Sequence, residues 1–300
     1  MLFDVLVIGD LFRDVIMSGF AAFPRLGTES FARELRYEIG GGTAITASGL
    51  AKLGMRVAAM GIVGEDEARW MIDRLNRVGV DTSLIQVDPV NPTGTTISVS
   101  FSGDRAFFTY NGANEGLPGL LTSVCARQAH HVHFAFPFDA MVLADVIRQL
   151  QTRGTTVSVD VGWQERWLMH PDSLEVLRLA DLFFPNEHEG QLITGHSDPT
   201  QMLDELQSRG IRNIALKLGQ QGALLRLGEQ QYRAIPLSVD VVDTTGAGDS
   251  FDAGFLSSWI RKLPPQRCLS VANICGALST RSLGGIAGFP SSAEVETMER

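Results

Sequence analysis

The stretch Asp243-Thr-Thr-Gly-Ala-Gly-Asp249-Ser-Phe-Asp-Ala-Gly-Phe255 carries most of the information about the fold. Its glycine-bracketed loop, Gly246-Ala247-Gly248, runs directly into a segment of helical periodicity, in which Phe251, Phe255 and Trp259 recur on one face. The first turn of a helix leaves backbone N–H groups without intrahelical partners, and glycines let an anion approach them. We therefore interpret the loop as an anion-binding helix start.

A carboxylate, Asp249, is expected in the first turn of that helix. An acid beside an anion hole is consistent with a site where a phosphoryl group is transferred and the acid handles a proton. The alternative is that Asp249 only complements the positive end of the helix dipole. The motif alone does not separate the two interpretations.

Composition restricts the setting of this chain. With 44% hydrophobic residues, the 300 residues are sufficient to bury a large core. The formal charge of −9 and the pI near 5.2 argue against nucleic acid or an anionic membrane as partner. Three scattered cysteines, Cys125, Cys268 and Cys275, indicate reduced core thiols. The acidic, glycine-interrupted start of the sequence is unlike a signal peptide, so we expect a cytoplasmic protein.

Short apolar runs alternate with amphipathic segments along the chain. Residues 5–8 form the first expected strand, and residues 43–53, which follow three glycines, form the first expected helix. Such alternation predicts a mostly parallel sheet with helices on both faces, in one domain over residues 1–300. The later expected strands are 57–62, 132–134, 156–159, 182–184 and 213–218, and the later expected helices are 65–78, 141–151, 202–207 and 268–281.

Two segments interrupt this alternation. Residues 18–37 lack helical periodicity, and residues 95–110 indicate a hairpin with its turn at 102–105. We expect them to form a small β-sheet that projects from the core, with lid segments at roughly 15–38 and 93–112. Such a sheet covers a pocket and excludes water, or forms a homodimer surface, and the two roles are compatible.

Polar residues follow several of the expected strands, where ligands bind in open α/β sheets. Asp14 lies soon after the first strand and is a candidate to bind acceptor hydroxyls, or else a surface aspartate. Asn186 and Glu189 lie one helical turn apart and suit hydrated Mg²⁺ and phosphate oxygens, or else a capping box. Lys217 is a candidate phosphate ligand, or else a lysine that extends to solvent.

Other motifs are weaker or missing. His131 and His133 would share one strand face, but no cysteine or carboxylate lies nearby at ligand spacing, so a metal site there has little support. The sequence contains neither a Walker A motif nor a strand–GxGxxG–helix fingerprint. A P-loop enzyme and a dinucleotide-binding Rossmann enzyme are therefore disfavoured.

These residues together resemble the ribokinase-like (PfkB) family of carbohydrate kinases. The stretch from Asp243 to Phe251 is similar to the C-terminal signature of that family. The segments Gly40-Gly-Gly-Thr-Ala, Ala51-Lys-Leu-Gly54 and Gly61-Ile-Val-Gly64-Glu-Asp66 resemble its N-terminal signature. The resemblance covers nearly the whole chain. It implies a three-layer sandwich, in which helices cover both faces of a mostly parallel central sheet, with a small β-sheet lid.

The resemblance also implies residue roles. Asp249 would be the catalytic base, and Gly246, Ala247 and Gly248 the anion hole. The acceptor would be bound by Asp14, Gly41, Gly42 and Asn114, and the nucleotide by Asn186, Lys217, Gly219, Thr244 and Asn273. Glu189 would organise Mg²⁺, directly or through water, and Asp243 would lie at a monovalent-cation site that takes K⁺.

Three departures from the family pattern concern the substrate. Ile45 stands where many members have an asparagine that touches the sugar, which argues against ribose itself. Lys217 stands where many relatives have threonine. After Asp160, the chain continues Val161-Gly-Trp-Gln-Glu-Arg166 in place of the usual asparagine and arginine.

We therefore expect an ATP-dependent phosphotransferase that acts on a hydroxyl group of a small sugar or sugar derivative, with Asp249 as general base. A nucleoside kinase is the first alternative, in which Phe107, Phe108 and Tyr110 supply an aromatic slot for the base. A non-catalytic sugar-binding protein is the second alternative. The sequence leaves the acceptor unnamed.

Overall fold

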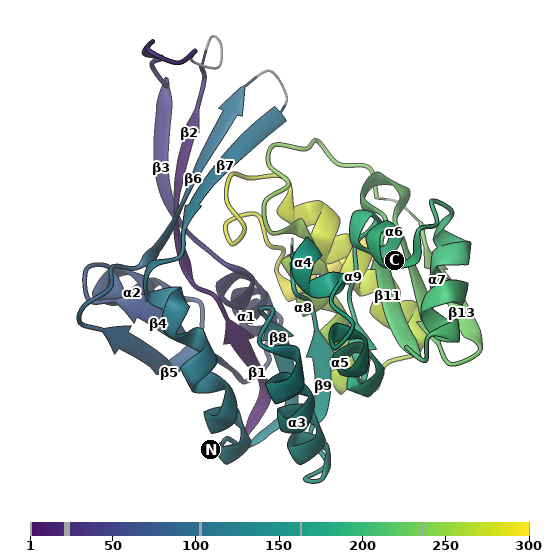
Figure 1. Cartoon of the computed structure of the whole chain (residues 1–300). Helices are drawn as coiled ribbons and strands as arrows, with labels where there is room; N and C mark the ends of the chain where they lie inside the picture. The colour runs from purple at the N-terminus through teal and green to yellow at the C-terminus, as the bar shows by residue number, and fades with distance from the viewer. Residues whose placement is uncertain (1, 21–24, 102–103, 163, 236, 300) are drawn as a thin grey trace.

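A nine-stranded sheet lies at the centre of the computed structural model, which describes residues 2–20, 25–101, 104–162, 164–235 and 237–299 (Figure 1). The strand order is β13-β12-β11-β10-β9-β8-β1-β4-β5. The strands from β11 to β5 run parallel, while β12 and β13 are antiparallel additions at one edge. Their bounds are β1 Phe3–Gly9, β4 Val57–Gly64, β5 Asp81–Asp88, β8 Ala129–Ala135, β9 Thr156–Val159, β10 Leu182–Phe183, β11 Asn213–Lys217, β12 Ala223–Leu227 and β13 Gln230–Ala234.

Helices cover both faces of this sheet, as expected. The alternating side chains of β1 enter two separate cores, with Val5 and Val7 on one face and Leu6 and Ile8 on the other. The first core is closed by α1 (Gly42–Lys52), α2 (Ala68–Arg77), α8 (Ala247–Ile260), α9 (Pro265–Ser279) and α10 (Ser292–Met298). The second face carries η1 (Gly112–Ala126), α3 (Ala140–Gln151), α4 (Glu165–Leu168), α5 (Ser173–Leu179), α6 (Glu187–Thr194) and α7 (Pro199–Ser208). A short 3₁₀ turn, η2 (Gly219–Gln221), follows β11.

The expected three-layer α/β architecture is therefore confirmed, and the three cysteines are buried free thiols. Within the described ranges, no helix combines the length and the apolar character needed to cross a bilayer. The sequence did not reveal β5, β12 and β13, and the expected helix 65–78 begins only at Ala68. β12 and β13 extend the sheet by an antiparallel hairpin, which the alternation of strands and helices does not predict.

The two irregular segments pair into a separate four-stranded sheet of order β3-β2-β6-β7, which projects from the core in Figure 1. Its strands are β2 (Phe12–Ser18), β3 (Glu34–Gly40), β6 (Gly94–Phe101) and β7 (Asp104–Tyr110), so the lid begins earlier and ends later than 15–38. Asp14 is thus a strand residue of the lid and not part of a loop, because β2 follows β1 after only two residues. Ser102 and Gly103, at the expected hairpin turn, and residues 21–24 lie outside the described residues.

The register of the lid separates its two faces. One row across the sheet is Glu38, Asp14, Thr96 and Thr109, and the next row is Tyr37, Val15, Ile97 and Phe108. Because neighbouring rows point to opposite faces, the first row belongs to a polar face and the second to an apolar face. We call the face that carries Asp14 the inner face of the lid.

Candidate active site

The carboxyl ends of the parallel strands bring polar residues to one edge of the sheet. Asp10 follows β1, Asp160 follows β9, Asn186 follows β10 and Lys217 ends β11. Asn186 and Lys217 form an isolated parallel β-bridge. Four segments that are far apart in sequence therefore meet where open α/β sheets place their ligands.

Helix α8 begins beside this edge. Gly246 adopts a left-handed conformation, with φ of 71°, and α8 starts at Ala247, so Asp249 lies in its first turn. The backbone N–H of Ser250 donates to the Gly246 carbonyl at 2.9 Å, and that of Ala247 donates to Thr244 at 3.2 Å. Within the described part of the chain, the N–H of Gly248 has no protein acceptor. The helix start therefore presents a free donor.

Ile45 supports the loop that carries these donors. It is 3% exposed, and a Cβ added at Gly246 would lie 2.8 Å from its Cδ1. Its side chain also lies against Gly285. At this position, the apolar residue packs beneath the glycine loop that precedes α8.

Three carboxylates surround the run Gly40–Gly42. A Cβ at Gly40 would collide with the carboxylate of Asp14, and a Cβ at Gly41 would lie 3.2 Å from Oδ1 of Asp10. A Cβ at Gly42 would lie 3.1 Å from Oδ1 of Asp249. Each glycine thus faces a different carboxylate, and a side chain at any of the three positions would crowd it. We call this arrangement the acidic cradle: Asp10, Asp14, Asp249 and the three glycines.

Burial dominates the electrostatics of the cradle. It raises the pKa of Asp10 and of Asp14 to about 7, with a further contribution from neighbouring carboxylates. The pKa of Asp249 is raised to about 6 by burial and by Asp160, while Lys217 opposes the rise. Asp10 accepts a hydrogen bond from the N–H of Gly42 at 3.1 Å. An acid with a pKa near 6 suits proton transfer around neutral pH.

Lys217 is buried between two acids. Its Nζ lies 2.5 Å from Oδ2 of Asp160 and 3.3 Å from Oδ1 of Asp252. Burial disfavours the Lys217 cation, but the charges of the two aspartates outweigh it and raise the pKa of Lys217 above its ordinary value. Burial opposes the ionisation of Asp160 as well, yet the Lys217 ammonium holds the pKa of Asp160 at about 2. Lys217 is therefore a fixed internal cation and does not extend to solvent.

A chain of hydrogen bonds runs through β8 and β9 beside Asp252. His133 Nδ1 and His131 Nε2 each lie 2.7 Å from the Ser158 hydroxyl, and His131 Nδ1 lies 2.8 Å from the Thr156 hydroxyl. The two histidines share one face of β8, as expected, and burial lowers their pKa values to about 3 and 4. Both rings are consequently neutral near pH 7, and His131 is bonded to two hydroxyl groups and His133 to one.

Asn186 and Glu189 form the capping box of α6. The Asn186 side chain accepts from the Glu189 N–H at 2.9 Å, and Glu189 Oε2 accepts from the Asn186 N–H at 2.9 Å. Burial and the charge of Asp160 raise the pKa of Glu189 to about 7. No group of three or more His, Cys, Asp or Glu is arranged as a metal site among the described residues.

Two further expected residues hold loops together. Asn114 is 2% exposed, accepts from the Leu11 N–H at 3.1 Å and donates to the Leu11 carbonyl at 2.9 Å. Asp243 accepts from the N–H and hydroxyl of Thr245 at 2.9 and 2.7 Å, and from the N–H of Gly284 at 2.9 Å. Asn114 thus fixes the segment between Asp10 and Asp14, and Asp243 ties the signature stretch to the loop after α9.

A pocket of about 570 Å³ lies on the other side of the α8 start. Its lining includes four of the expected nucleotide residues: Lys217, Gly219, Thr244 and Asn273. The Nδ2 of Asn273 donates to the Ile235 carbonyl at 2.8 Å. The apolar part of the wall comes from Leu237, Val239, Val241, Phe251 and Ala277. The volume and mixed lining are typical of a small-molecule site.

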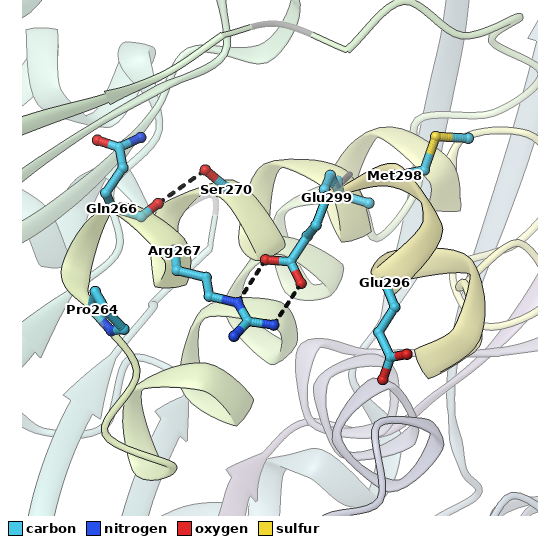
Figure 2. Close-up of a pocket in the computed structure, with 8 residues that line it drawn as sticks. Pro264, Gln266, Arg267, Ser270, Glu296, Met298 and Glu299 are labelled. Atoms are coloured by element: carbon cyan, nitrogen blue, oxygen red, sulfur yellow. Dashed lines mark hydrogen bonds and ion pairs between the residues drawn. The ribbon is translucent and has the colours of Figure 1, made fainter.

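A second pocket, of about 740 Å³, lies between α9 and α10 (Figure 2). The Arg267 guanidinium pairs with the Glu299 carboxylate at 2.9 Å, and Figure 2 shows this pair across the pocket. Its lining contains none of the strand-end residues, so the larger volume does not make it the better candidate.

Comparison with known proteins decides the family. Residues 3–292 match the model described as pfkB family carbohydrate kinase. The chain belongs to this family. A Bacillus subtilis 2-dehydro-3-deoxygluconokinase is 30% identical to this pfkB-family chain over 84% of each chain. An ATP-dependent ribose-1-phosphate kinase from Halopiger xanaduensis is 32% identical over 85% of each.

A solved structure of a putative ribokinase II from E. coli, in complex with ATP and Mg²⁺, superposes on this pfkB-family chain with a TM-score of 0.85. It is 25% identical and covers 99% of both chains. The similarity therefore extends over the core and the lid together.

Some residues of the site received no role from the sequence. Asp10, Asp160 and Asp252 all lie within 4 Å of another charged or polar member of the site. The available signal was position, since Asp10 and Asp160 each follow a strand directly. Asp252 gave no such signal, because its importance arises only from contact with Lys217, 35 residues away.

Proposed function

We propose that this pfkB-family chain transfers the γ-phosphoryl group of ATP to a hydroxyl group of a small sugar or sugar derivative. One observation carries the proposal: Asp249 lies between the 570 Å³ pocket and the acidic cradle. Gly248, the preceding residue, lines the 570 Å³ pocket, and Oδ1 of Asp249 lies 3.1 Å from the Cβ position of Gly42 in the acidic cradle. Two substrates bound in these spaces would meet at Asp249.

Asp249 acts as the general base. Its carboxylate takes the proton of the acceptor hydroxyl as that oxygen attacks the γ-phosphorus, and ADP leaves on the opposite side. Phosphoryl transfer of this kind depends on positioning and charge stabilisation. The pKa of Asp249, about 6, keeps the base ionised at neutral pH.

The Gly246–Gly248 loop is the anion hole in this proposal. The free N–H of Gly248 and the positive end of α8 stabilise the charge on the transferring phosphoryl oxygens. Lys217 adds a fixed cation, because its Nζ would lie 3.4 Å from a Cβ at Gly248. Asp160 and Asp252 hold this ammonium in place.

The 570 Å³ pocket accommodates the nucleotide. Its apolar wall suits the flat adenine ring, and Gly219, Thr244 and Asn273 lie along its polar part. The backbone N–H of Ala247 already bonds to Thr244, so Thr244 connects the pocket wall to the helix start. Support also comes from the ATP-bound E. coli structure of the same fold.

Mg²⁺ fits the residues at the α6 start. Asn186 and Glu189 supply the oxygen donors that Mg²⁺ prefers, and Glu189 uses only Oε2 in the capping box. The raised pKa of Glu189 reflects a buried carboxylate that a nearby cation would stabilise. Mg²⁺ held there through water would neutralise phosphate charge. For Asp243 we propose a K⁺ site, and a rate that does not depend on K⁺ would remove it.

The acceptor lies in the acidic cradle. Asp14 accepts hydroxyl hydrogen bonds, while Gly41 and Gly42 let the acceptor approach the backbone. Asn114 contributes by bracing Leu11, since both ends of its amide are already bonded there. We therefore assign Asn114 a supporting role and no direct contact with the acceptor.

The lid does not form the aromatic slot for a base that the nucleoside-kinase alternative requires. Phe107 pairs with Ser98 on the inner face of the lid, whereas Phe108 and Tyr110 pair with Ile97 and Thr95 on the opposite face. The expected grouping of the three aromatic residues is wrong, because neighbouring strand residues alternate in direction. The second alternative, a non-catalytic sugar-binding protein, would leave the free donor of Gly248 and the raised pKa of Asp249 without a use.

We also propose a homodimer through the apolar face of the lid. Tyr37, Ile97 and Phe108 lie in one row on this face and are 51, 39 and 56% exposed. Contiguous exposed apolar surface of this kind marks interaction sites. Sedimentation analysis of the wild-type chain and of Phe108→Glu tests it: the wild type should sediment as a dimer and the variant as a monomer.

A coupled ADP-release screen tests the kinase proposal. The acceptors are pentoses, hexoses, sugar acids, sugar phosphates and nucleosides, each with ATP and Mg²⁺. Release of ADP that depends on one acceptor class, with a phosphorylated product found by mass spectrometry, is the expected result. Saturable ATP binding with no acceptor-dependent ADP release would favour the non-catalytic alternative.

A further inference from the structure

The acceptor side of the site is built from carboxylates. Gly40, Gly41 and Gly42 face Asp14, Asp10 and Asp249 in turn. On the lid, Glu38 lies directly opposite Asp14 in the β2–β3 register. Three segments, the end of β1, the lid and the start of α8, thus each contribute a carboxylate to the acidic cradle, while Glu38 is paired with Arg74.

Among these carboxylates, Asp14 has the least compensation of its charge by hydrogen bonds or ion pairs. It is 8% exposed, and among the described residues none donates a hydrogen bond to its carboxylate or forms an ion pair with it. A buried carboxylate without a donor is costly, and the cost falls when a ligand supplies one.

The nearby basic residues are committed elsewhere. Arg13 pairs with Glu67, and Arg74 pairs with Glu38. Lys217 lies on the nucleotide side with Asp160 and Asp252. Among lid residues whose side chains are described, Arg36 is the basic residue on the inner face, and it is exposed and opposite Ile16, two rows from Asp14.

Hydroxyl groups complete the lining. Thr96 lies opposite Asp14 and shares a hydrogen bond of 3.2 Å with Thr109 on the inner face. An ionised carboxylate only accepts hydrogen bonds, whereas a hydroxyl group both donates and accepts. The lining is therefore complementary to a ligand rich in hydroxyl groups. It is not complementary to a carboxylate or phosphate, which brings further negative charge and no donor.

From these contacts we infer that the acceptor is an uncharged polyhydroxy compound, and that the acidic cradle rejects anionic acceptors. The inference rests on the proposed kinase function and names its substrate class. It separates this chain from its two relatives, whose names specify a sugar acid and a sugar phosphate as acceptors.

Matched pairs of acceptors provide the test. D-Ribose is compared with D-ribose 1-phosphate, and D-glucitol with D-gluconate, at pH 7.5 and low salt. Both calorimetric binding in the presence of a non-hydrolysable ATP analogue and kcat/KM for ADP release are measured. In each pair that the enzyme uses, the affinity and the kcat/KM of the neutral member should exceed those of its anionic counterpart by about 100-fold or more. This ratio should shrink at 0.5 M salt, because salt screens charge repulsion.

The Asp14→Asn variant distinguishes charge from shape. It should raise KM for the neutral member and lower KM for the anionic member, so the ratio should fall by about 10-fold or more. Loss of general packing would not shift the two members in opposite directions. Asp73→Asn, on the exposed side of α2, removes one charge away from the cradle and should leave the ratio unchanged.

The outcomes separate the two proposals. Higher kcat/KM for an anionic member, or Arg36-dependent binding of it, would overturn the neutral-acceptor inference and leave the kinase proposal standing. Selective binding of a neutral member without any ADP release would support the inference about charge and overturn the kinase proposal. Failure of every neutral member to bind, while an anionic one binds, would also overturn the inference.

Discussion

His133 Nε2 and Asp252 Oδ2 face each other 4.0 Å apart in the interior, and neither atom has a hydrogen-bond partner in the described part of the chain. The hydrogen bonds of the neighbouring side chains determine which nitrogen of each histidine carries a hydrogen. Thr156 donates its hydroxyl hydrogen to the His130 carbonyl, so it accepts from His131 Nδ1. Because His131 is neutral, its Nε2 accepts from Ser158, and the Ser158 oxygen in turn accepts from His133 Nδ1.

His133 Nε2 is therefore left as an acceptor that points toward Asp252. Burial raises the pKa of Asp252 well above its ordinary value, so Asp252 is protonated near neutral pH, although at 4.0 Å its Oδ2 is too far from His133 Nε2 for a hydrogen bond. Lys217 consequently has one ionised partner, Asp160, and one neutral partner, Asp252. The net charge of Lys217, Asp160 and Asp252 together is therefore close to zero before any phosphate binds.

Ser158→Ala tests this chain of hydrogen bonds. It leaves His131 Nε2 without a donor and His133 Nδ1 without an acceptor, so we expect a loss of about 1–3 kcal/mol in the free energy of unfolding. Urea titration followed by circular dichroism measures it. The exposed control Ser208→Ala should change the free energy by less than about 0.5 kcal/mol. Equal losses in the two variants would contradict the proposed directions of donation.

Lys217→Met should affect stability and nucleotide binding separately. Removing the cation leaves Asp160 as a buried charge without its partner, which costs about 3–5 kcal/mol in the free energy of unfolding. Binding of an ATP analogue should weaken as well. The double variant Lys217→Met/Asp160→Asn should recover stability but not nucleotide affinity. Recovery of both by the double variant would mean that Lys217 acts only as a structural ion pair.

Asp249→Asn should lower kcat by about 10²- to 10⁴-fold, because the acceptor hydroxyl loses its base. Calorimetry should show that ATP still binds. The exposed Asp240→Asn, in the loop before the signature stretch, is the matched control and should keep wild-type kcat. A variant that retains a tenth or more of wild-type kcat would exclude Asp249 as the base.

The pH dependence of the rate checks the same role. Since the base must be ionised, wild-type kcat should fall as the pH drops through about 6, the pKa of Asp249. A rate that stays constant down to pH 5 would contradict the assignment.

The stability of the ligand-free protein should rise as the pH falls from 8 to about 6.5. Asp10 and Asp14 have folded-state pKa values of about 7, above their unfolded values near 3.8, so the folded state binds more protons in this range. Below about 6.5 the gain is offset, because His131 and His133 stay neutral when folded but take up protons when unfolded. Differential scanning fluorimetry across this range measures the effect.

Asp14→Asn should raise Tm at pH 8 and have a smaller effect at pH 6, because the wild-type acid is then largely protonated. Asp66 provides the opposite case. Thr93 donates hydrogen bonds to its carboxylate and lowers its pKa, so Asp66→Asn should lower Tm at pH 8. An Asp14→Asn variant that is less stable at pH 8 would contradict the cost of burial assigned to this carboxylate.

The sequence by itself determined the local features of this protein. Strand and helix periodicity predicted the parallel sheet with helices on both faces, because these patterns depend on neighbouring residues. The glycines of the signature stretch predicted the start of α8 with Asp249 in its first turn, which α8 confirms. Apolar runs with a hairpin turn predicted the lid, although its strands are paired in a mixed order that no local pattern specifies.

Only the tertiary structure decided which side chains meet. From the sequence, Lys217 could equally bind phosphate or extend to solvent. In the structure it is buried in contact with Asp160 and Asp252. The register of β6 and β7 separated Phe107 from Phe108 and Tyr110, which sequence proximity had grouped. The acidic cradle joins residues 10, 14, 40–42 and 249. Charge, burial and hydrogen bonding act through space, so residues hundreds of positions apart acquire their chemistry only when the fold brings them into contact.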